Sequence, residues 1–268
     1  MRFRQVLVAT LCGSLLVAAC SSSGSSGGGA DSSSSASAID LAVFAASSLS
    51  TAFTQIGSDF EAANPGTTVS FNFGSSADLA ASIESEGTAD VFASASGTYM
   101  DEVSTKVGVS GRADFAQNGL VVITPTDNPA GISSLKDLAK PGVQVVLAAE
   151  GVPVGDYARQ ALQAAGIEKA VLANVVSNED DDASVVAKIT SGEADAAIVY
   201  VSDVTSAIGP QVNAVEIPDA ANVIATYPIA VVTGTTHADV ATAFVDYVIG
   251  SQGQATLRDF NFLPPPPS

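Results

Sequence analysis

The clearest hydrophobic pattern in the chain is an apolar run over residues 41–46 that stops at Ser47 and Ser48. An amphipathic pattern begins there, and its apolar residues recur at helical spacing: Leu49, Phe53, Ile56 and Phe60. We therefore predict a buried strand that runs directly into a helix, with Ser47 or Ser48 at the helix N-cap. Such a turn directs backbone N–H groups and a hydroxyl to the positive end of the helix dipole, where they can hold an anion. The alternative is that Ser48 only caps its helix.

The same arrangement recurs twice along the chain. An alternating strand over residues 69–73 leads through Gly74-Ser75-Ser76 into a second helix, and an apolar strand over residues 143–147 leads through a turn at 151–155 into a third. The carboxyl ends of strands in α/β sheets are where such proteins bind ligands. We expect these small, uncharged turns to direct several helix N-termini into one cleft.

The remaining pattern alternates between strands and helices. Further strands are predicted over residues 89–95, 120–123, 171–176, 196–200 and 227–232, and further helices over residues 99–107, 133–139, 185–189 and 240–248. This alternation predicts an α/β fold with parallel sheets covered by helices on both faces. A length of 268 residues allows two modest domains or one large domain.

Residues 1–19 have the features of a secretory signal peptide. Arg2 and Arg4 precede a mostly apolar segment, which ends in Val17-Ala18-Ala19-Cys20. This ending is similar to a lipobox, so we expect lipidation of Cys20; the alternative is an ordinary signal that ends near a cysteine. Residues 20–38 are rich in Ser and Gly and are predicted to form a flexible linker. No later apolar run reaches the roughly 18 residues of a membrane span, so the lipid is the expected membrane anchor.

Cysteine and histidine are too scarce for several kinds of site. Cleavage would remove Cys12 and leave Cys20 as the single cysteine, which excludes a disulfide and a cysteine metal site in the mature chain. His237 is the only histidine, so a Ser-His triad and an imidazole metal site have little support. We expect no cofactor and no residues that ligate a metal cation directly.

The chain is strongly acidic. Its formal charge is −18, and loss of the two N-terminal arginines takes it to about −20, which makes nucleic acid an improbable partner. An anion ligand is still compatible with this charge, because surface charges are screened beyond about 8 Å at physiological salt. Converging amides and hydroxyls act at contact distance.

Five motifs then carry a family resemblance. They are FAASSL at residues 44–49, FGSSADL at 73–79, ADVFASA at 89–95, VPVGDYA at 152–158 and GEADAAIVY at 192–200. With these motifs in this order, the chain from about Leu41 to Phe262 resembles the molybdate-binding proteins of ABC uptake transporters. The resemblance implies a two-lobed type II periplasmic-binding-protein fold with a two-strand hinge near residues 120–123 and 227–231. Lobe 1 would contain residues 39–119 and 228–268, and lobe 2 residues 120–227.

The resemblance also implies a ligand-binding set. Ser48 and Ser76 would each donate a hydroxyl and a backbone N–H to a tetrahedral oxyanion, Val154 would donate its amide, and Tyr200 its hydroxyl. The alternatives are that Ser76 is a plain N-cap and that Tyr200 is a core residue whose hydroxyl bonds elsewhere.

A further amide is expected at the start of the helix after the acidic run. Counting back from Tyr200 places it at Asp182, with Ala183 as the nearest substitute. We expect the carboxylate of Asp182 to face solvent, because an inward carboxylate would repel a dianion.

The implied function is capture of molybdate, with tungstate as a close isostere, by a monomeric, non-enzymatic lipoprotein. It would deliver the anion to an ABC-transporter permease at the outer face of the cytoplasmic membrane. The first alternative is a receptor for another oxyanion such as sulfate. A serine hydrolase that uses Ser48 or Ser76 is disfavoured because neither lies in a Gly-x-Ser-x-Gly elbow. The last alternative is a surface lipoprotein that has lost its ligand.

Overall fold

The computed structural model describes residues 38–267. The predicted signal peptide, the lipidated Cys20 and almost all of the predicted linker at 20–38 lie outside the described residues. These three assignments therefore stay predictions.

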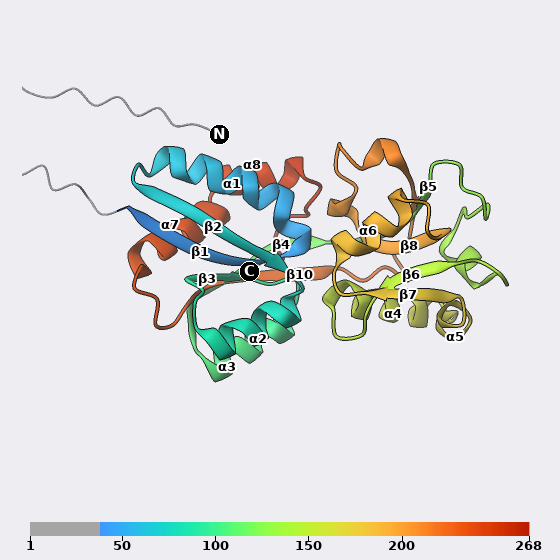
Figure 1. Ribbon diagram of the computed structural model, residues 1–268, viewed down its shortest axis with the longest axis horizontal. Coiled ribbons are helices and arrows are strands. Elements are labelled where there is room, and N and C mark those ends of the chain that lie inside the picture. The colour runs from blue at the N-terminus through green and yellow to red at the C-terminus, as the bar shows by residue number, and fades with distance from the viewer. Residues whose placement is uncertain (1–37, 268) are drawn as a thin grey trace, which may run out of the picture. The chain divides into compact units, whose positions relative to one another are not determined.

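A first five-stranded sheet has the order β2-β1-β3-β10-β4 (Figure 1). Its strands are β1 (Ile39–Ala46), β2 (Thr67–Gly74), β3 (Val91–Ala93), β4 (Val109–Asn118) and β10 (Ala225–Val232). Strand β1 runs parallel to β2 and β3, whereas β10 runs antiparallel to β3 and β4.

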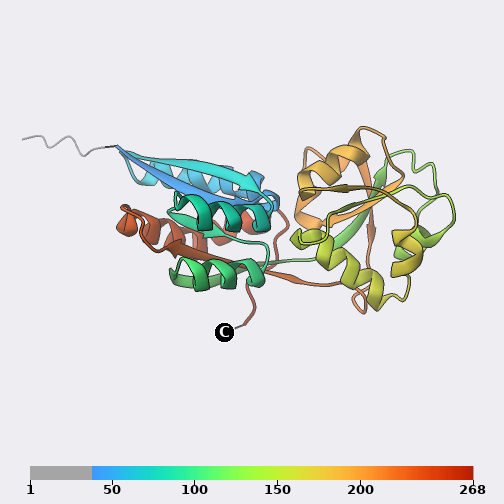
Figure 2. The same ribbon diagram turned by 60° about the horizontal axis from the view of Figure 1, so that its bottom comes forward.

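Helices cover both faces of this sheet. They are α1 (Ser50–Ala63), α2 (Ser76–Glu86), α3 (Gly97–Lys106), α7 (Ala238–Ile249) and α8 (Ser251–Asp259). Strand side chains alternate between the faces: Val43 lies in one core cluster with residues of α1, α7 and α8, while Phe44 lies in another with residues of α2 and α3. Figure 1 and Figure 2 show α1 and the α2–α3 pair on opposite sides of the strands.

A second five-stranded sheet has the order β7-β6-β8-β5-β9. Its strands are β5 (Leu120–Pro125), β6 (Val145–Ala148), β7 (Val175–Glu179), β8 (Ala196–Tyr200) and β9 (Val212–Glu216). The α-helices of this part are α4 (Pro153–Ala164), α5 (Glu168–Leu172) and α6 (Asp182–Thr190), and short 3₁₀ turns span Leu135–Ala139, Val201–Asp203 and Gly209–Gln211. Each sheet with its helices forms one lobe.

The chain crosses between the lobes twice. The strand that follows each crossing occupies the equivalent position in its sheet. Strand β5 follows β4 after Gly119, and β10 follows β9 after residues 217–224. In each sheet the crossing strand takes the fourth place, antiparallel to both of its neighbours. The predicted boundary after residue 119 falls at the first crossing. The second crossing precedes the predicted boundary after residue 227, because Ala225 already pairs with Asn118 in the first sheet.

Several local predictions were wrong. The sheets are mixed rather than parallel, because a crossing strand enters each of them antiparallel, and side-chain periodicity does not encode strand direction. Residues 171–172 end helix α5, and the predicted strand there begins only at Val175. Strands β4 and β9 and helix α8 were not predicted, since their polar residues obscure the alternation.

Pro228 lies inside β10, which is a central strand. Proline cannot donate a ladder hydrogen bond and occurs in sheets mainly at edges or bulges. The pairing of β10 with β4 shifts register between Tyr227 and Pro228, which accommodates the missing N–H. The Pro228 carbonyl still accepts a bond from the Ser94 N–H at 2.9 Å.

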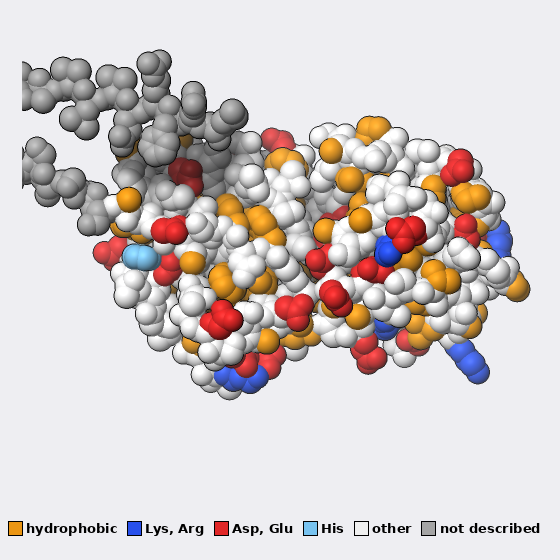
Figure 3. Space-filling view, viewed as in Figure 1, with side chains coloured by type: hydrophobic (Ala, Val, Ile, Leu, Met, Phe, Trp, Pro, Cys, Tyr) orange, Lys and Arg blue, Asp and Glu red, His pale blue; other side chains and the backbone are white. Residues whose placement is uncertain are grey.

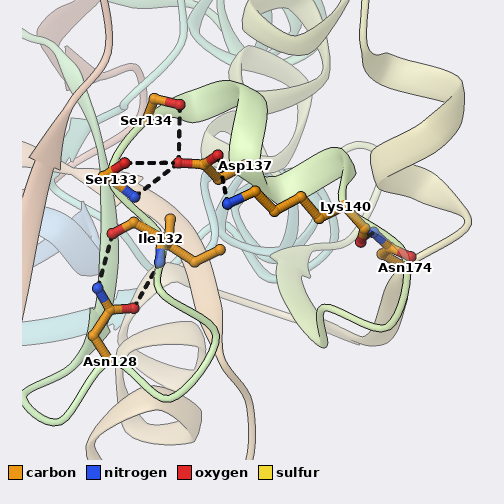
Figure 4. A network of polar contacts seen from close by, with 7 residues as sticks. All are labelled: Asn128, Ile132, Ser133, Ser134, Asp137, Lys140 and Asn174. Atoms are coloured by element: carbon orange, nitrogen blue, oxygen red, sulfur yellow. Dashed lines mark hydrogen bonds and ion pairs between the residues drawn. The ribbon is translucent and has the colours of Figure 1, made fainter.

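A carboxylate orders the segment before the 3₁₀ turn at 135–139 (Figure 4). Asp137 accepts hydrogen bonds from the Ser133 N–H and from the hydroxyls of Ser133 and Ser134, and it pairs with Lys140 at 2.8 Å. The Lys140 ammonium, followed by the Ser133 donors, holds the pKa of Asp137 well below its usual value. This network therefore retains its charge at neutral pH.

Among residues 38–267, no helix is both long enough and apolar enough to span a membrane.

We predict that Gly155→Ala destabilises the second lobe. A Cβ at Gly155 would lie 2.3 Å from the Ala149 carbonyl oxygen and 2.5 Å from that of Ala148, so the start of α4 would have to shift. Overpacking of this kind costs about 1–3 kcal/mol, to be measured as the free energy of unfolding in urea. Gly97→Ala at the start of α3 is the control, because its nearest neighbour lies 3.8 Å away. Equal stability of the two variants would contradict the packing argument.

Candidate functional site

The residues predicted for ligand binding all line one small cavity. The ends of β1 and β2 are aligned, since Ala46 pairs with Gly74, and the second lobe supplies the start of α4, the start of α6 and the end of β8. The cavity is lined by Ala46, Ser47, Ser48, Gly74, Ser75, Ser76, Ala95, Val152, Pro153, Val154, Asp182 and Tyr200. Residues as far apart in the sequence as Ala46 and Tyr200 thus meet at the strand ends of both sheets.

The two lobes touch around this cavity. The Ser47 hydroxyl donates to Asp182, and the Tyr99 hydroxyl donates to the Gly151 carbonyl. The Tyr157 hydroxyl lies 3.5 Å from the Ala95 carbonyl oxygen. This cavity has a volume of about 10 Å³, which is room for one water at most. A wider cavity of about 180 Å³, lined by Ser47, Ser48 and Asp182 among others, lies beside it. A ligand larger than water therefore requires the residues around the smaller cavity to move apart.

The two serine turns differ from the predicted helix caps. Ser47 begins a 3₁₀ turn over Ser47–Leu49 whose N-cap is Ala46, so neither Ser47 nor Ser48 caps the helix through its side chain. The Ser48 Oγ instead lies 3.0 Å from the Tyr227 hydroxyl. The turn begins one residue earlier than the predicted cap at Ser47, and both serines line the cavity.

Ser75, not Ser76, caps helix α2 and accepts a bond from the Asp78 N–H. The Oγ of Ser76 accepts a bond from the Ala95 N–H at 2.9 Å. The Ser76 hydroxyl proton has no partner in this bond and remains available to donate. The alternative in which Ser76 is a plain N-cap is therefore wrong.

Tyr200 and Val154 present donors from the second lobe. The Tyr200 side chain is 1% exposed, and its hydroxyl has no hydrogen-bond partner. Burial raises the pKa of Tyr200 well above its usual value, so the hydroxyl stays protonated. Val154 is the second residue of α4; its side chain is buried, and an N–H at that position has no acceptor within its own helix.

Asp182 departs from the prediction. It is the first residue of α6, so its backbone N–H has no acceptor within its own helix, but its side chain is buried rather than solvated. One carboxylate oxygen accepts the Ser47 hydroxyl, while the other, Oδ2, has no partner. The substitute Ala183 is exposed and lines a different cavity. Helical spacing places a residue at a helix start but does not determine which way its carboxylate turns.

Sequence reasoning missed a polar group that supports Ser48. The Tyr227 hydroxyl contacts Ser48 and lies 3.4 Å from the Asn118 amide nitrogen, which donates to Ser202 at 2.7 Å. Tyr227 lies in the crossing strand β10, just before the bulge at Pro228. The sequence signal that could have indicated this group is the polar Tyr227 next to Pro228 within an otherwise apolar strand.

The donors that line the cavity are hydroxyl and amide dipoles rather than charged bases. No Lys, Arg or His is among its lining residues in the described chain, and residues 38–267 contain no cluster of three or more His, Cys, Asp or Glu that could hold a metal ion. Acidic side chains are scattered over the surface in Figure 3, with few basic ones among them. His237 contacts Asp90 instead of either serine. Hydroxyl and amide donors from two lobes suit a small oxyanion.

Two mixed sheets, a double chain crossing and a donor-lined cavity between the lobes together define a two-lobed solute-binding protein. The family model described as bacterial extracellular solute-binding protein matches residues 41–263. The molybdate-binding protein ModA of Mycobacterium tuberculosis is 40% identical over 226 residues, which cover 84% of this chain and 85% of the relative. The chain therefore belongs to the bacterial extracellular solute-binding protein family, with ModA proteins among its relatives.

Solved structures support the fold. The periplasmic molybdate-binding protein of Azotobacter vinelandii superposes with a TM-score of 0.76 at 20% identity and covers 84% of this chain and 100% of its own. The sulfate-binding protein SubI of M. tuberculosis gives a TM-score of 0.72 at 18% identity over 84% and 87% of the two chains. The predicted periplasmic-binding-protein fold is confirmed.

We predict that Tyr227→Phe weakens oxyanion binding without unfolding the protein. The change removes the hydroxyl that orients Ser48, and one hydrogen bond corresponds to roughly a two- to tenfold loss of affinity. Isothermal titration measures the affinity, and circular dichroism checks the fold. Tyr247→Phe is the matched control, since Tyr247 packs on Phe60 away from the cavity. The same loss in both variants would contradict a role for Tyr227 in orienting Ser48.

Proposed function

We propose that the protein is the binding component of an ABC importer and that it captures molybdate between its lobes. The observation that carries this proposal is the buried, unpartnered Tyr200 hydroxyl, which lines one cavity with Ser48, Ser76 and the start of α4. The 40% identity to ModA supports molybdate as the ligand. The proposed contacts are the hydroxyls of Ser48, Ser76 and Tyr200 and the amides of Val154 and Asp182.

Neutral donors suit both capture and release. A hydrogen bond to a charged acceptor contributes roughly 1.5–3 kcal/mol, more than a bond between neutral groups. Several such donors replace the water shell of a small dianion. A micromolar complex needs only about −8 kcal/mol, so a site without a permanent counter-charge holds the anion and still releases it to a transporter.

Ligand binding is coupled to the approach of the lobes. Ser48 and Ser76 belong to the first lobe, whereas Val154 and Tyr200 belong to the second, so one anion collects its full donor set only when the lobes meet. The anion thus favours the closed arrangement by its differential affinity. A permease can distinguish loaded from unloaded protein by the arrangement of the lobes.

The family and the N-terminal sequence support the cellular setting that we propose. Proteins of this family act as extracytoplasmic components of transport systems. We extend this to a monomer that is anchored through a lipid on Cys20 at the outer face of the cytoplasmic membrane. The protein has no enzymatic activity in this account, and tungstate, a close isostere of molybdate, binds the same site.

Sulfate is the main alternative ligand, because a sulfate-binding protein shares the fold. Titration of the purified protein with molybdate, tungstate, sulfate and phosphate separates the possibilities. We expect heat from molybdate and tungstate and little from the other two. Heat from sulfate alone would reassign the ligand, and heat from none of the four would remove the proposed function.

We predict that Tyr200→Phe lowers anion affinity by at least about tenfold, the value of one hydrogen bond to a charged acceptor. The same change should leave the free energy of unfolding equal or higher, because it removes a buried hydroxyl that has no partner in the described part of the chain. Thermal melting and titration on one preparation test both effects.

Ser48→Ala should also weaken binding, and Ser104→Ala, an exposed serine on α3, serves as its control. Wild-type affinity in both Tyr200→Phe and Ser48→Ala would rule out this donor set.

A further inference from the structure

Two tyrosines connect the lobes outside the donor cavity. Tyr99 lies on α3 of the first lobe, and its hydroxyl donates to the Gly151 carbonyl of the second lobe. Tyr157 lies on α4 of the second lobe, and its hydroxyl donates in the opposite direction, to the Ala95 carbonyl of the first lobe at 3.5 Å. Figure 1 shows α3 and α4 in different lobes. Each lobe therefore contributes one hydroxyl donor and one backbone acceptor.

The Gly151 carbonyl belongs to the turn that leads into α4. Gly151 has a φ of 90°, a backbone conformation that favours glycine, and its N–H donates to Asp156 at 2.9 Å. Because Asp156 lies in the first turn of α4, this bond fixes the turn to the helix. Val154, whose amide is a proposed ligand donor, lies between the two. A contact that holds the Gly151 carbonyl thus holds the start of α4 against the first lobe.

The Ala95 carbonyl lies equally close to a donor of the first lobe. The Ala95 N–H donates to the Ser76 Oγ at 2.9 Å, which directs the remaining proton of that hydroxyl. The flanking residues are held as well, since the Ser94 Oγ accepts the Ser96 N–H at 3.0 Å and donates to the Ser96 carbonyl at 2.7 Å. A hydroxyl bonded to the Ala95 carbonyl thus contacts the residue that orients Ser76.

Both tyrosines are well placed to act as neutral donors. Burial, followed by the charge of Asp156, raises the pKa of Tyr99 above its usual value, and burial raises the pKa of Tyr157. Their rings pack on the core of the protein. A ring that is already held by packing loses little further rotamer freedom when its hydroxyl forms a bond.

Neither tyrosine lines the donor cavity. A further contact between the lobes, from Ser47 to Asp182, lies inside that cavity, where a bound anion would alter it. The two tyrosine contacts can instead form with a ligand in place. Separation of the lobes breaks both of them, because donor and acceptor belong to different lobes.

We propose that Tyr99 and Tyr157 are positioning residues: their hydrogen bonds form only when the lobes meet, and they hold the donors of Val154 and Ser76 around the bound oxyanion. Tyr99 of the first lobe fixes the start of α4, and Tyr157 of the second lobe fixes Ala95 beside Ser76. Neither hydroxyl touches the ligand. Both slow its release, because the lobes must separate before it leaves. This inference rests on the proposed function, and it assigns the residence time of the ligand to residues outside the ligand-binding set.

The deciding experiment compares the wild type with Tyr99→Phe and Tyr157→Phe, which each remove one hydroxyl and keep the ring. Rapid filtration with radiolabelled molybdate measures the association rate constant, and a chase with unlabelled molybdate measures the dissociation rate constant. We expect each variant to release molybdate roughly two- to tenfold faster, the value of one hydrogen bond. The association rate constant should not change, because the ligand enters while the lobes are apart.

A variant with both changes and a matched control extend the comparison. The two bonds share no partner, so their effects on the dissociation rate constant should multiply. Tyr247→Phe, on α7 and packed against Phe60, should release molybdate at the wild-type rate. Urea unfolding of each ligand-free protein checks the fold. A merely structural role would lower the free energy of unfolding and leave the dissociation rate constant unchanged.

The outcomes separate this inference from the proposed function. If both single variants release molybdate at the wild-type rate, the positioning role is refuted and the proposed function stands. Slower association with unchanged dissociation would place the two hydroxyls at ligand entry and would also refute it. If the wild type binds none of the four oxyanions, the proposed function fails and the positioning role fails with it.

Discussion

The buried hydroxyl of Tyr200 has no hydrogen-bond partner among residues 38–267. Leaving a buried polar group unpaired costs roughly 1–3 kcal/mol, so the folded chain is less stable than it would be with a phenylalanine there. The Ser76 hydroxyl proton and the N–H groups of Val154 and Asp182, at the starts of α4 and α6, likewise have no acceptor within their own helices. A small anion can satisfy all of these donors at once. The unpaired donors make the ligand-free protein less stable. When a ligand accepts their hydrogen bonds, that lost stability is regained as binding free energy, and this requires the donors of both lobes to surround the ligand.

The sheet topology explains why those donors meet. In each lobe the parallel strands end at the interface between the lobes, and helices that follow them begin there. The antiparallel fourth strand of each sheet is the crossing segment, so β5 and β10 join the two interfaces covalently. Tyr200 pairs with Leu120, the first residue of β5, and Tyr227 lies in β10. Both tyrosines thus lie close to the crossings, Tyr200 beside β5 and Tyr227 in β10 itself. Their rings pack edge to face, with 5.8 Å between the centroids.

Much of this could be predicted from the sequence. Apolar or alternating strands that end at small residues predicted three strand–turn–helix units, and the structure confirms β1, β2 and β6 with the helices that follow them, together with β8. The five predicted site residues line one cavity, although their contact with a ligand stays a prediction. Other features depend on tertiary contacts: the antiparallel direction of β5 and β10, the support of Ser48 by Tyr227, and the inward turn of Asp182. An aspartate in an acidic run is usually solvated, whereas Asp182 is buried and accepts a hydrogen bond from Ser47 of the other lobe.

A crystal structure of the protein grown with molybdate tests the central claim most directly. The account predicts one anion between the lobes, with its oxygens within hydrogen-bond distance of the hydroxyls of Ser48, Ser76 and Tyr200 and of the Val154 amide. Electron density for the anion beside a Lys or Arg side chain, or at a place where the Tyr200 hydroxyl remains unpartnered, would contradict it.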